Sequence, residues 1–327
     1  MEENRITRRK ALSLLGGSAL AAALPGGFAR AQGAPLRFGI QTTIWGAVAI
    51  LAEAEKTFAK AGANVVINKF DSGANARDAM IGGHIDVVNI GASPFVIGVA
   101  KSNLVAIGMS AYAGGTLALV ASKKSGIKTV AGLRGKKIAS QLGSQTDFVF
   151  QNKIMPAFGM KKGDYEVINT KFADHASALA SGSVDAFAGV EPYPSVAELG
   201  GFGVILTNYM KYDMVPILLG SNWDVLTKRT DDLVKFMKGW QLAIDIFKKD
   251  KARAAKIVGD FFRGRGYKMD DEIFRRAMST MDVTTAYRPE VKTYLTSMAE
   301  TLVKRKRLDS VPDINRALDG RILKAVG

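Results

Sequence analysis

The sequence lacks cysteine altogether in its 327 residues. This absence excludes disulfides, thiolate metal sites, thiol nucleophiles and a lipid-modified cysteine. Histidine is almost as scarce: only His84 and His175 are present, and neither has carboxylates at the spacing that metal ligands adopt. We therefore expect no metal site and no catalytic histidine.

Motifs of several enzyme classes are also missing. The chain has no phosphate-binding loop, no complete dinucleotide-binding glycine pattern after a strand, and no serine in a nucleophile-elbow pattern. We therefore expect no cofactor and no enzymatic activity. Beyond the first 31 residues no apolar run reaches the roughly 20 residues that span a bilayer.

The first 31 residues have the pattern of an export signal. Arg8 and Arg9 precede a short, weakly apolar run, and Ala29-Arg30-Ala31 is typical of a cleavage site before Gln32. The run is too short for a membrane anchor. We expect residues 1–31 to be removed, and the paired arginines favour the twin-arginine route over the general route. The expected location is the periplasm.

The charge balance is strongly basic. The whole chain has 45 basic and 30 acidic residues; without residues 1–31, which hold five basic and two acidic residues, 40 and 28 remain, a net charge of +12. Such a charge suits nucleic acid, an anionic membrane or an anionic ligand, and export argues against nucleic acid. The basic run Lys304–Arg307 follows a helical pattern, and we interpret it as a helix C-terminus stabilised by cations.

Apolar runs and helical patterns alternate from Leu36 to Leu219. This alternation predicts an α/β fold with two series of mainly parallel strands flanked by helices, and a helical C-terminal tail follows. The first series has expected strands at 36–41, 64–70, 85–90, 104–110 and 117–121, and the second at 137–140, 165–170, 184–188, 204–206 and 215–219. Expected helices include 45–61, 143–158 and 312–318.

Several loops that follow these strands hold glycine or small hydroxyl residues just before a helix. In open sheets ligands bind at this edge, and free N–H groups at helix N-termini favour anions. Each loop has a structural alternative, because Thr42, Thr43, Ser93 and Ser144 could be helix N-caps and Trp45 could belong to the core. The sequence therefore indicates a cleft without deciding which loops line it.

Four segments together resemble the substrate-binding proteins of nitrate/sulfonate/taurine-type ABC transporters. Each segment alone is a weak signal, but their order and spacing match the family over residues 36–219. The segments are Ala79–Val87 (AMIGGHIDV), Leu133–Ala139 (LRGKKIA) followed by Gly143-Ser144, Ala178–Ala186 (ALASGSVDA) and Glu191-Pro192-Tyr193.

The resemblance implies a type II, venus-flytrap periplasmic binding protein with two lobes. Residues 32–113 and 218–327 would form lobe I and residues 114–217 lobe II, with hinges near 112–117 and 214–219. The implied ligand contacts are Thr42, Trp45, Ser93, Ser144 and Glu191, with Gln41, Gln145 and Thr146 close by.

The implied function is solute capture for an ABC importer. The chain would act as a monomer, bind a small organic anion or zwitterion such as a taurine-like or alkanesulfonate-like sulfonate, and deliver it to a permease with its ATPase. Nitrate, an aromatic carboxylate or a pyrimidine or thiamine precursor remain alternatives, because Gln145-Thr146-Asp147 departs from the sulfonate binders' pattern. A pyrimidine-synthase-like enzyme on the same fold is the other alternative.

Overall fold

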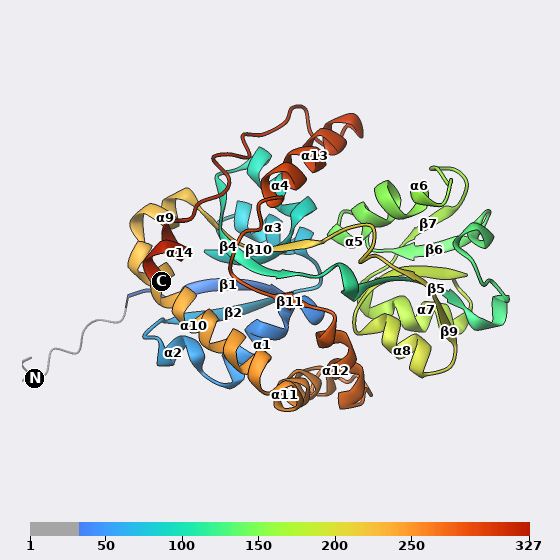
Figure 1. Ribbon diagram of the computed structural model, residues 1–327, viewed down its shortest axis with the longest axis horizontal. Helices are drawn as coiled ribbons and strands as arrows, with labels where there is room; N and C mark the ends of the chain where they lie inside the picture. The colour runs from blue at the N-terminus through green and yellow to red at the C-terminus, as the bar shows by residue number, and fades with distance from the viewer. Residues whose placement is uncertain (1–32) are drawn as a thin grey trace, which may run out of the picture. The chain divides into compact units, whose positions relative to one another are not determined.

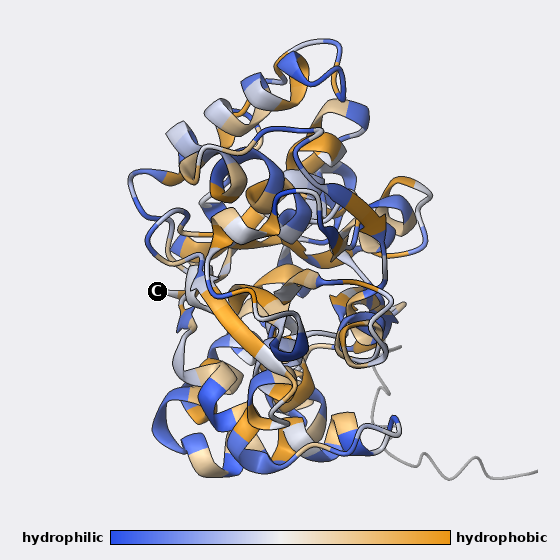
Figure 2. Cartoon of the chain, turned by 90° about the vertical axis from the view of Figure 1, so that its right-hand side faces the viewer, coloured by the Kyte–Doolittle hydropathy of each residue, from blue (hydrophilic) through white to orange (hydrophobic). Residues whose placement is uncertain are grey.

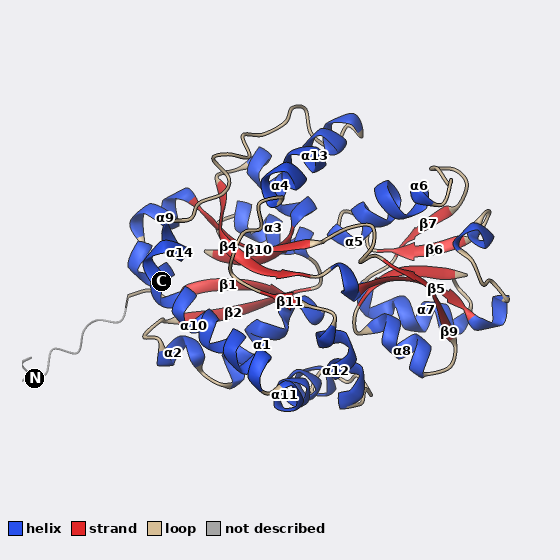
Figure 3. Ribbon diagram, viewed as in Figure 1, coloured by secondary structure: helices blue, strands red, loops and turns tan. Residues whose placement is uncertain are grey.

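The structure is a computed structural model that describes residues 33–327. The expected export signal, residues 1–31, lies outside the described residues. Two β-sheets with helices on their faces make up the described chain (Figures 1 and 3). Within this range no helix is both long and apolar enough to cross a bilayer.

The first sheet has six strands. They are β1 (Leu36–Gln41), β2 (Val65–Phe70), β3 (Val87–Gly91), β4 (Leu104–Tyr112), β10 (Pro216–Asn222) and β11 (Asp282–Val283). Their order is β11-β4-β10-β3-β1-β2. β1 pairs in parallel with β2 and β3, whereas β10 runs antiparallel between β3 and β4. β3 and β4 are buried along their whole length, which explains their continuous apolar runs.

The second sheet has five strands. They are β5 (Leu117–Ser122), β6 (Lys137–Ser140), β7 (Glu166–Asn169), β8 (Ala186–Val190) and β9 (Gly203–Asn208). Their order is β7-β6-β8-β5-β9, in which β6 runs parallel to β7 and β8, and β5 runs antiparallel to β8 and β9. The expected two-lobed α/β fold is confirmed, with mixed rather than mainly parallel sheets, because the strands β5 and β10 that follow the crossings between sheets run antiparallel to their neighbours.

The chain crosses between the sheets twice. It leaves the first sheet after Tyr112, enters the second at Leu117, and returns between Asn208 and Pro216. Within the described residues, we propose that 33–113 with 218–327 form lobe I and 114–217 lobe II, the division expected from the sequence. Pro216 and Ile217 already pair with β4, so the second crossing ends just before them.

Fourteen α-helices are assigned within residues 33–327, and many of them pack on the sheets. In lobe I they are α1 (Ala47–Ala54), α2 (Thr57–Lys60), α3 (Gly73–Ile81), α4 (Ala92–Lys101), α9 (Trp223–Lys228), α10 (Thr230–Lys249), α11 (Lys251–Arg263), α12 (Asp271–Ser279), α13 (Val291–Lys304) and α14 (Arg321–Val326). In lobe II they are α5 (Gln145–Val149), α6 (Met155–Ala157), α7 (His175–Ser181) and α8 (Tyr193–Leu199).

Three expected helices differ from the structure. Residues 45–61 form a 3₁₀ turn, α1 and α2, with a break at Lys56 (φ 54°) that lets Phe58 stack on Phe236 at 4.8 Å between ring centroids. Residues 143–158 contain a π-helix, Phe150–Ile154. Residues 312–318 form turns instead of a helix, because Ala106 of β4 donates a hydrogen bond to the Ala317 carbonyl (2.8 Å).

The core of lobe I centres on an aromatic cluster. Phe38 of β1 lies edge-on to Phe236 (4.9 Å between centroids) and to Trp240 (5.7 Å) of α10, and all three side chains are fully buried. Edge-to-face contacts of this kind stabilise a core beyond the area that they bury. Figure 2 shows that the helices alternate polar and apolar residues along their length.

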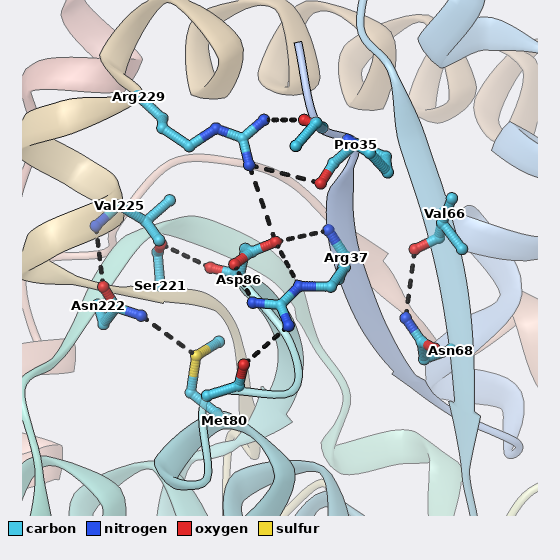
Figure 4. Close-up of polar contacts among 12 residues, drawn as sticks. Pro35, Arg37, Val66, Asn68, Met80, Asp86, Ser221, Asn222, Val225 and Arg229 are labelled. Carbon is cyan, nitrogen blue, oxygen red and sulfur yellow. Dashed lines mark hydrogen bonds and ion pairs between the residues drawn. The ribbon is translucent and has the colours of Figure 1, made fainter. Parts of the chain in front are cut away.

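A polar cluster fixes the N-terminal ends of β1 and β3. Asp86 accepts hydrogen bonds from Arg37 N (2.8 Å), Nε (3.0 Å) and Nη2 (2.7 Å), and its own carbonyl accepts one from Ser221 Oγ (2.7 Å). Burial raises the pKa of Asp86, but the bonds from Arg37 outweigh it and the net pKa is lowered. Arg229 joins this cluster to the Pro35 carbonyl (Figure 4).

Candidate functional site

The loops that leave the opposite, carboxyl ends of the strands converge where the lobes meet. β1 and β3 contribute from lobe I, and β6 and β8 from lobe II. All eight expected site residues lie in or beside these loops, and each is at most 9% exposed: Gln41, Thr42, Trp45, Ser93, Ser144, Gln145, Thr146 and Glu191. Polar groups that are buried in this way need hydrogen-bond partners within the protein.

The loop after β1 is held mainly by its own hydrogen bonds. Thr42 Oγ1 donates to the Phe70 carbonyl (3.2 Å), and Thr43 caps the 3₁₀ turn Ile44–Gly46. Gly46 is required here, because a Cβ at this position would lie 2.4 Å from the Gln41 carbonyl. Trp45 is fully buried, and its Nε1 donates to Thr116 Oγ1 (2.8 Å) in the first crossing. Trp45 therefore fastens lobe I to the crossing.

The loop after β6 is fixed by hydrogen bonds at the N-cap of α5. Ser144 Oγ accepts a hydrogen bond from Asp147 N (3.1 Å), and the Asp147 carboxylate accepts one from Gly143 N (3.1 Å). Ser144 is thus a helix cap, the structural alternative that its sequence left open. The next side chains, Gln145 and Thr146, are buried in the first turn of α5, and Thr146 Oγ1 has no hydrogen-bond partner within the described residues.

Gln145 reaches across to lobe I. Its Oε1 accepts a hydrogen bond of 2.6 Å from Ser93 N, in the first turn of α4. A Cβ at Gly91 would lie 2.6 Å from the Gln145 Cβ, so glycine is what permits this approach. An oxygen from the other lobe therefore occupies the position that the free N–H groups of a helix N-terminus offer to an anion.

The amide nitrogen of Gln145 makes a second hydrogen bond to lobe I. Its Nε2 donates to Tyr294 Oη (3.0 Å) on α13, and Tyr294 donates to Asp213 Oδ1 (2.7 Å) in the second crossing. Lys153 pairs with Asp213 at 2.7 Å. This relay of Ser93, Gln145, Tyr294 and Asp213 connects α4, α5, α13 and the crossing, so the contact between the lobes is stabilised by hydrogen bonds within the chain.

Glu191 follows β8 and is 7% exposed. Its carboxylate accepts hydrogen bonds from Ser195 Oγ (2.9 Å) and Ser195 N (3.2 Å) in the first turn of α8, the helix that follows. Burial raises its pKa from 4.5 to about 7, and the bonds from Ser195 offset only part of that rise. The Glu191 carbonyl accepts a hydrogen bond from Ile44 N of lobe I (3.1 Å), so the backbone, and not the carboxylate, contacts the other lobe.

The structure brings some expected residues into contact and leaves others apart. Ser93 and Gln145 meet directly, whereas the side chains of Thr42, Trp45, Ser144 and Glu191 bond elsewhere. Sequence reasoning did not identify the relay residues Tyr294 and Asp213, or Lys153. Tyr294 is 149 residues from Gln145, and no local pattern indicates such a contact.

Asp147 was also missed, although its sequence did carry a signal. A serine followed three residues later by an acid is typical of a helix start, and here that acid is Asp147. Its buried carboxylate also accepts hydrogen bonds from Ser140 Oγ (3.0 Å) and Gln151 Nε2 (2.7 Å). Burial raises the pKa of Asp147 despite these bonds.

Neither histidine is placed for catalysis in this cleft. Burial lowers the pKa of His175 to about 4, and its Nε2 contacts the Thr170 carbonyl (3.2 Å) between Phe172 and Phe187. His84 is exposed beyond α3. Within residues 33–327 no group of three or more histidine or acidic side chains could hold a metal ion.

Comparisons of sequence identify relatives over most of the chain. The model of the NMT1-like family matches residues 30–259. A putative aliphatic sulfonates-binding protein of Bacillus subtilis is 26% identical over 273 residues, which cover 83% of this chain and 80% of that protein. The taurine-binding periplasmic protein of Escherichia coli is 30% identical over 136 residues, 41% of this chain and 42% of that protein.

Solved structures share the fold. The alkanesulfonate-binding protein SsuA from Xanthomonas axonopodis pv. citri, bound to MOPS, has a TM-score of 0.77 and 21% identity over 88% of this chain and 98% of its own. The periplasmic nitrate-binding protein NrtA from Synechocystis PCC 6803 has a TM-score of 0.71 and 14% identity over 89% of this chain and 88% of its own. These likenesses establish a periplasmic binding protein fold.

Proposed function

The chain belongs to the NMT1-like family, and on that basis we propose that it is the extracytoplasmic solute-binding component of an ABC importer. It captures one small organic anion between its lobes and delivers it to a permease driven by an ATPase. The relatives matched by sequence are named as binding proteins, and a binding role needs no catalytic residues.

The observation that carries this proposal is the bond from Ser93 N to Gln145 Oε1. In this bond a backbone N–H at the start of α4 donates to an oxygen atom from lobe II. A sulfonate or carboxylate oxygen would replace the Gln145 oxygen there and gain a full negative charge at the positive end of the helix. Thr146 Oγ1, buried and unpartnered in the described structure, would donate to a second oxygen.

The preferred substrate class is an organic sulfonate of the taurine or alkanesulfonate type. An organic acid of the same size would use the same donors, so an aromatic carboxylate, nitrate and a pyrimidine or thiamine precursor are the alternatives to test. An amino group on the ligand could pair with Glu191 once its carboxylate rotates away from Ser195. Such a ligand would draw the proton from Glu191, because a cation nearby lowers a carboxyl pKa.

Export to the periplasm, by the twin-arginine or the general route, is part of the same proposal. The arginine pair Arg8-Arg9 and the cleavage pattern before Gln32 support it. Replacing both arginines by lysine and following the location of the protein tests the route. Loss of export supports the twin-arginine route, and unchanged export would assign the chain to the general one.

A thermal-shift screen tests the binding function. The chain from Gln32 onward is mixed with taurine, alkanesulfonates, nitrate, aromatic carboxylates and pyrimidines. A ligand at a hundred times its Kd should stabilise the folded state by about 2.7 kcal/mol. Thr146→Val should reduce that stabilisation, and Thr57→Val is the matched control, because Thr57 is also buried with an unpartnered Oγ1 but begins α2. No stabilisation by any of these solutes would reject the proposal.

An enzyme on the same fold would depend on a proton-transfer group. Because the pKa of His175 is about 4, its ring is neutral at pH 7 and does not act as an acid there. Replacing His84 and His175 by Gln should leave solute binding unchanged. A product formed by the wild type and not by this variant would assign an enzymatic role instead.

A further inference from the structure

A cavity of about 190 Å³ is lined by residues of both lobes, where α4 and α5 meet the segment after α13. Its lining includes Ser93 of α4 and Ser144 at the start of α5, so it adjoins the cleft. Its lining also includes Arg305 and Arg307, which follow α13, and Lys162, which lies between α6 and β7. The basic run 304–307 therefore lies next to lobe II.

The three cations come from both lobes. Arg305 and Arg307 belong to lobe I, Lys162 belongs to lobe II, and all three side chains are exposed. Within residues 33–327 none of the three forms an ion pair. Closing the lobes therefore brings like charges toward one cavity, which is unfavourable unless a counter-charge enters.

The carboxylate in the same wall is already engaged. Asp147 lines the cavity, but its oxygens accept hydrogen bonds from Ser140, Gly143 and Gln151. Arg307 approaches this loop, since its Nη2 lies 3.9 Å from the position of a Cβ on Gly143. Three cations against one occupied carboxylate leave the cavity with excess positive charge.

We propose that this cavity is a second anion site, adjoining the solute position at Ser93 N but built on other side chains, which takes a small tetrahedral or planar oxyanion such as sulfate, phosphate or a carboxylate. The anion accepts hydrogen bonds from Arg305 and Arg307 on one side and from Lys162 on the other. Because the site is complete only when the lobes are closed, its occupation favours the closed form and strengthens capture of the solute.

Isothermal titration with sodium sulfate, at an ionic strength held constant with sodium chloride, tests this site without any transported solute. One sulfate should bind to the wild type. The double variant Arg305→Gln/Arg307→Gln and the variant Lys162→Gln should each weaken binding on the order of tenfold, since a charge-assisted hydrogen bond is lost.

Matched controls exist in the same basic run. The double variant Lys304→Gln/Lys306→Gln removes the same two charges as Arg305→Gln/Arg307→Gln, but from residues that do not line the cavity. It should leave sulfate affinity within about twofold, because salt screens the field of exposed charges outside the site. Thr146→Val, which alters the cleft, should also leave it unchanged. Thermal melts in chloride verify that each variant is folded.

The expected closure is measured by small-angle scattering. Sulfate should reduce the radius of gyration of the wild type and not that of the Lys162→Gln variant. Equal sulfate affinity in the wild type and the Arg305→Gln/Arg307→Gln variant would overturn the proposal. So would a loss of affinity in Thr146→Val alone, because it would place the sulfate in the cleft.

Discussion

Glu191 should make the stability of the protein depend on pH in a defined window. The variant is Glu191→Gln, because glutamine has the shape and the hydrogen-bonding capacity of the protonated acid. Gln Oε1 can accept from Ser195 N, and its Nε2 can donate to Ser195 Oγ. The variant thus keeps the local contacts and removes only the ionisation of a side chain that is 7% exposed.

The magnitude follows from the change in pKa on folding. Folding raises the pKa of Glu191 from 4.5 to about 7, a difference of 2.5 units, and each unit corresponds to about 1.36 kcal/mol. Below pH 4.5 the carboxyl is protonated in both states and its contribution is fully present. As the pH rises through 7 the folded state loses about 3 kcal/mol relative to the unfolded state, because the unfolded chain ionises first.

Urea unfolding of wild type and Glu191→Gln, without ligand, at pH 4, 6, 7 and 8.5 measures this difference. The two free energies of unfolding should agree at pH 4, and the variant should be more stable by about 3 kcal/mol at pH 8.5. Glu166→Gln, which removes an exposed carboxyl on β7, is the control, because it leaves the buried carboxyl of Glu191 and its neighbours in place and should keep the wild-type pH dependence. A difference between wild type and Glu191→Gln that does not change with pH would refute the reasoning.

Three further changes test other parts of the structure. Asp86→Asn should lower the free energy of unfolding by about 3 kcal/mol at pH 7. Because folding lowers the pKa of Asp86 from 3.8, that contribution should be lost as the pH falls below 3.8. Urea unfolding at pH 7 and pH 3 measures the difference between wild type and variant, and an equal difference at both values would contradict the prediction. Gln145→Ala should lower the ratio of closed to open protein on the order of tenfold, seen as a larger radius of gyration in scattering, whereas Gln151→Ala, whose bond stays within lobe II, should not. Thr146→Val should leave stability within about 0.5 kcal/mol, since no partner is lost, yet weaken solute binding about tenfold in titration; unchanged binding would remove Thr146 from the site.

The sequence indicated the fold where its signals are local. Apolar runs predicted strands such as β4, which begins at Leu104 as expected and is buried throughout, because a strand buried on both faces needs a nearly continuous apolar segment. The prediction of a helix at 312–318 was wrong because the conformation of this segment is set by a distant part of the chain. Its backbone is taken up by Ala106, more than two hundred residues earlier, and helical periodicity carries no information about such a partner.

In the candidate site, too, the sequence predicts local features but not contacts between distant residues. The sequence could place Ser93 and Gln145 in loops at the carboxyl ends of strands, because that edge follows from the order of strands and helices. It could not show that they meet, since this depends on how the lobes close. It also could not decide between capping and ligand contact for Ser144, and the structure assigns it to capping.

The relay from Ser93 to Asp213 has a consequence for the order in which the protein is made. Tyr294 occupies the middle of the relay, and the segment around Ala317 completes the edge of β4. A chain still emerging from the ribosome can assemble the second sheet from residues 117–208, but it lacks the tyrosine that joins the lobes. The ability to close around a solute is therefore acquired only near the end of synthesis, after both sheets have their strands.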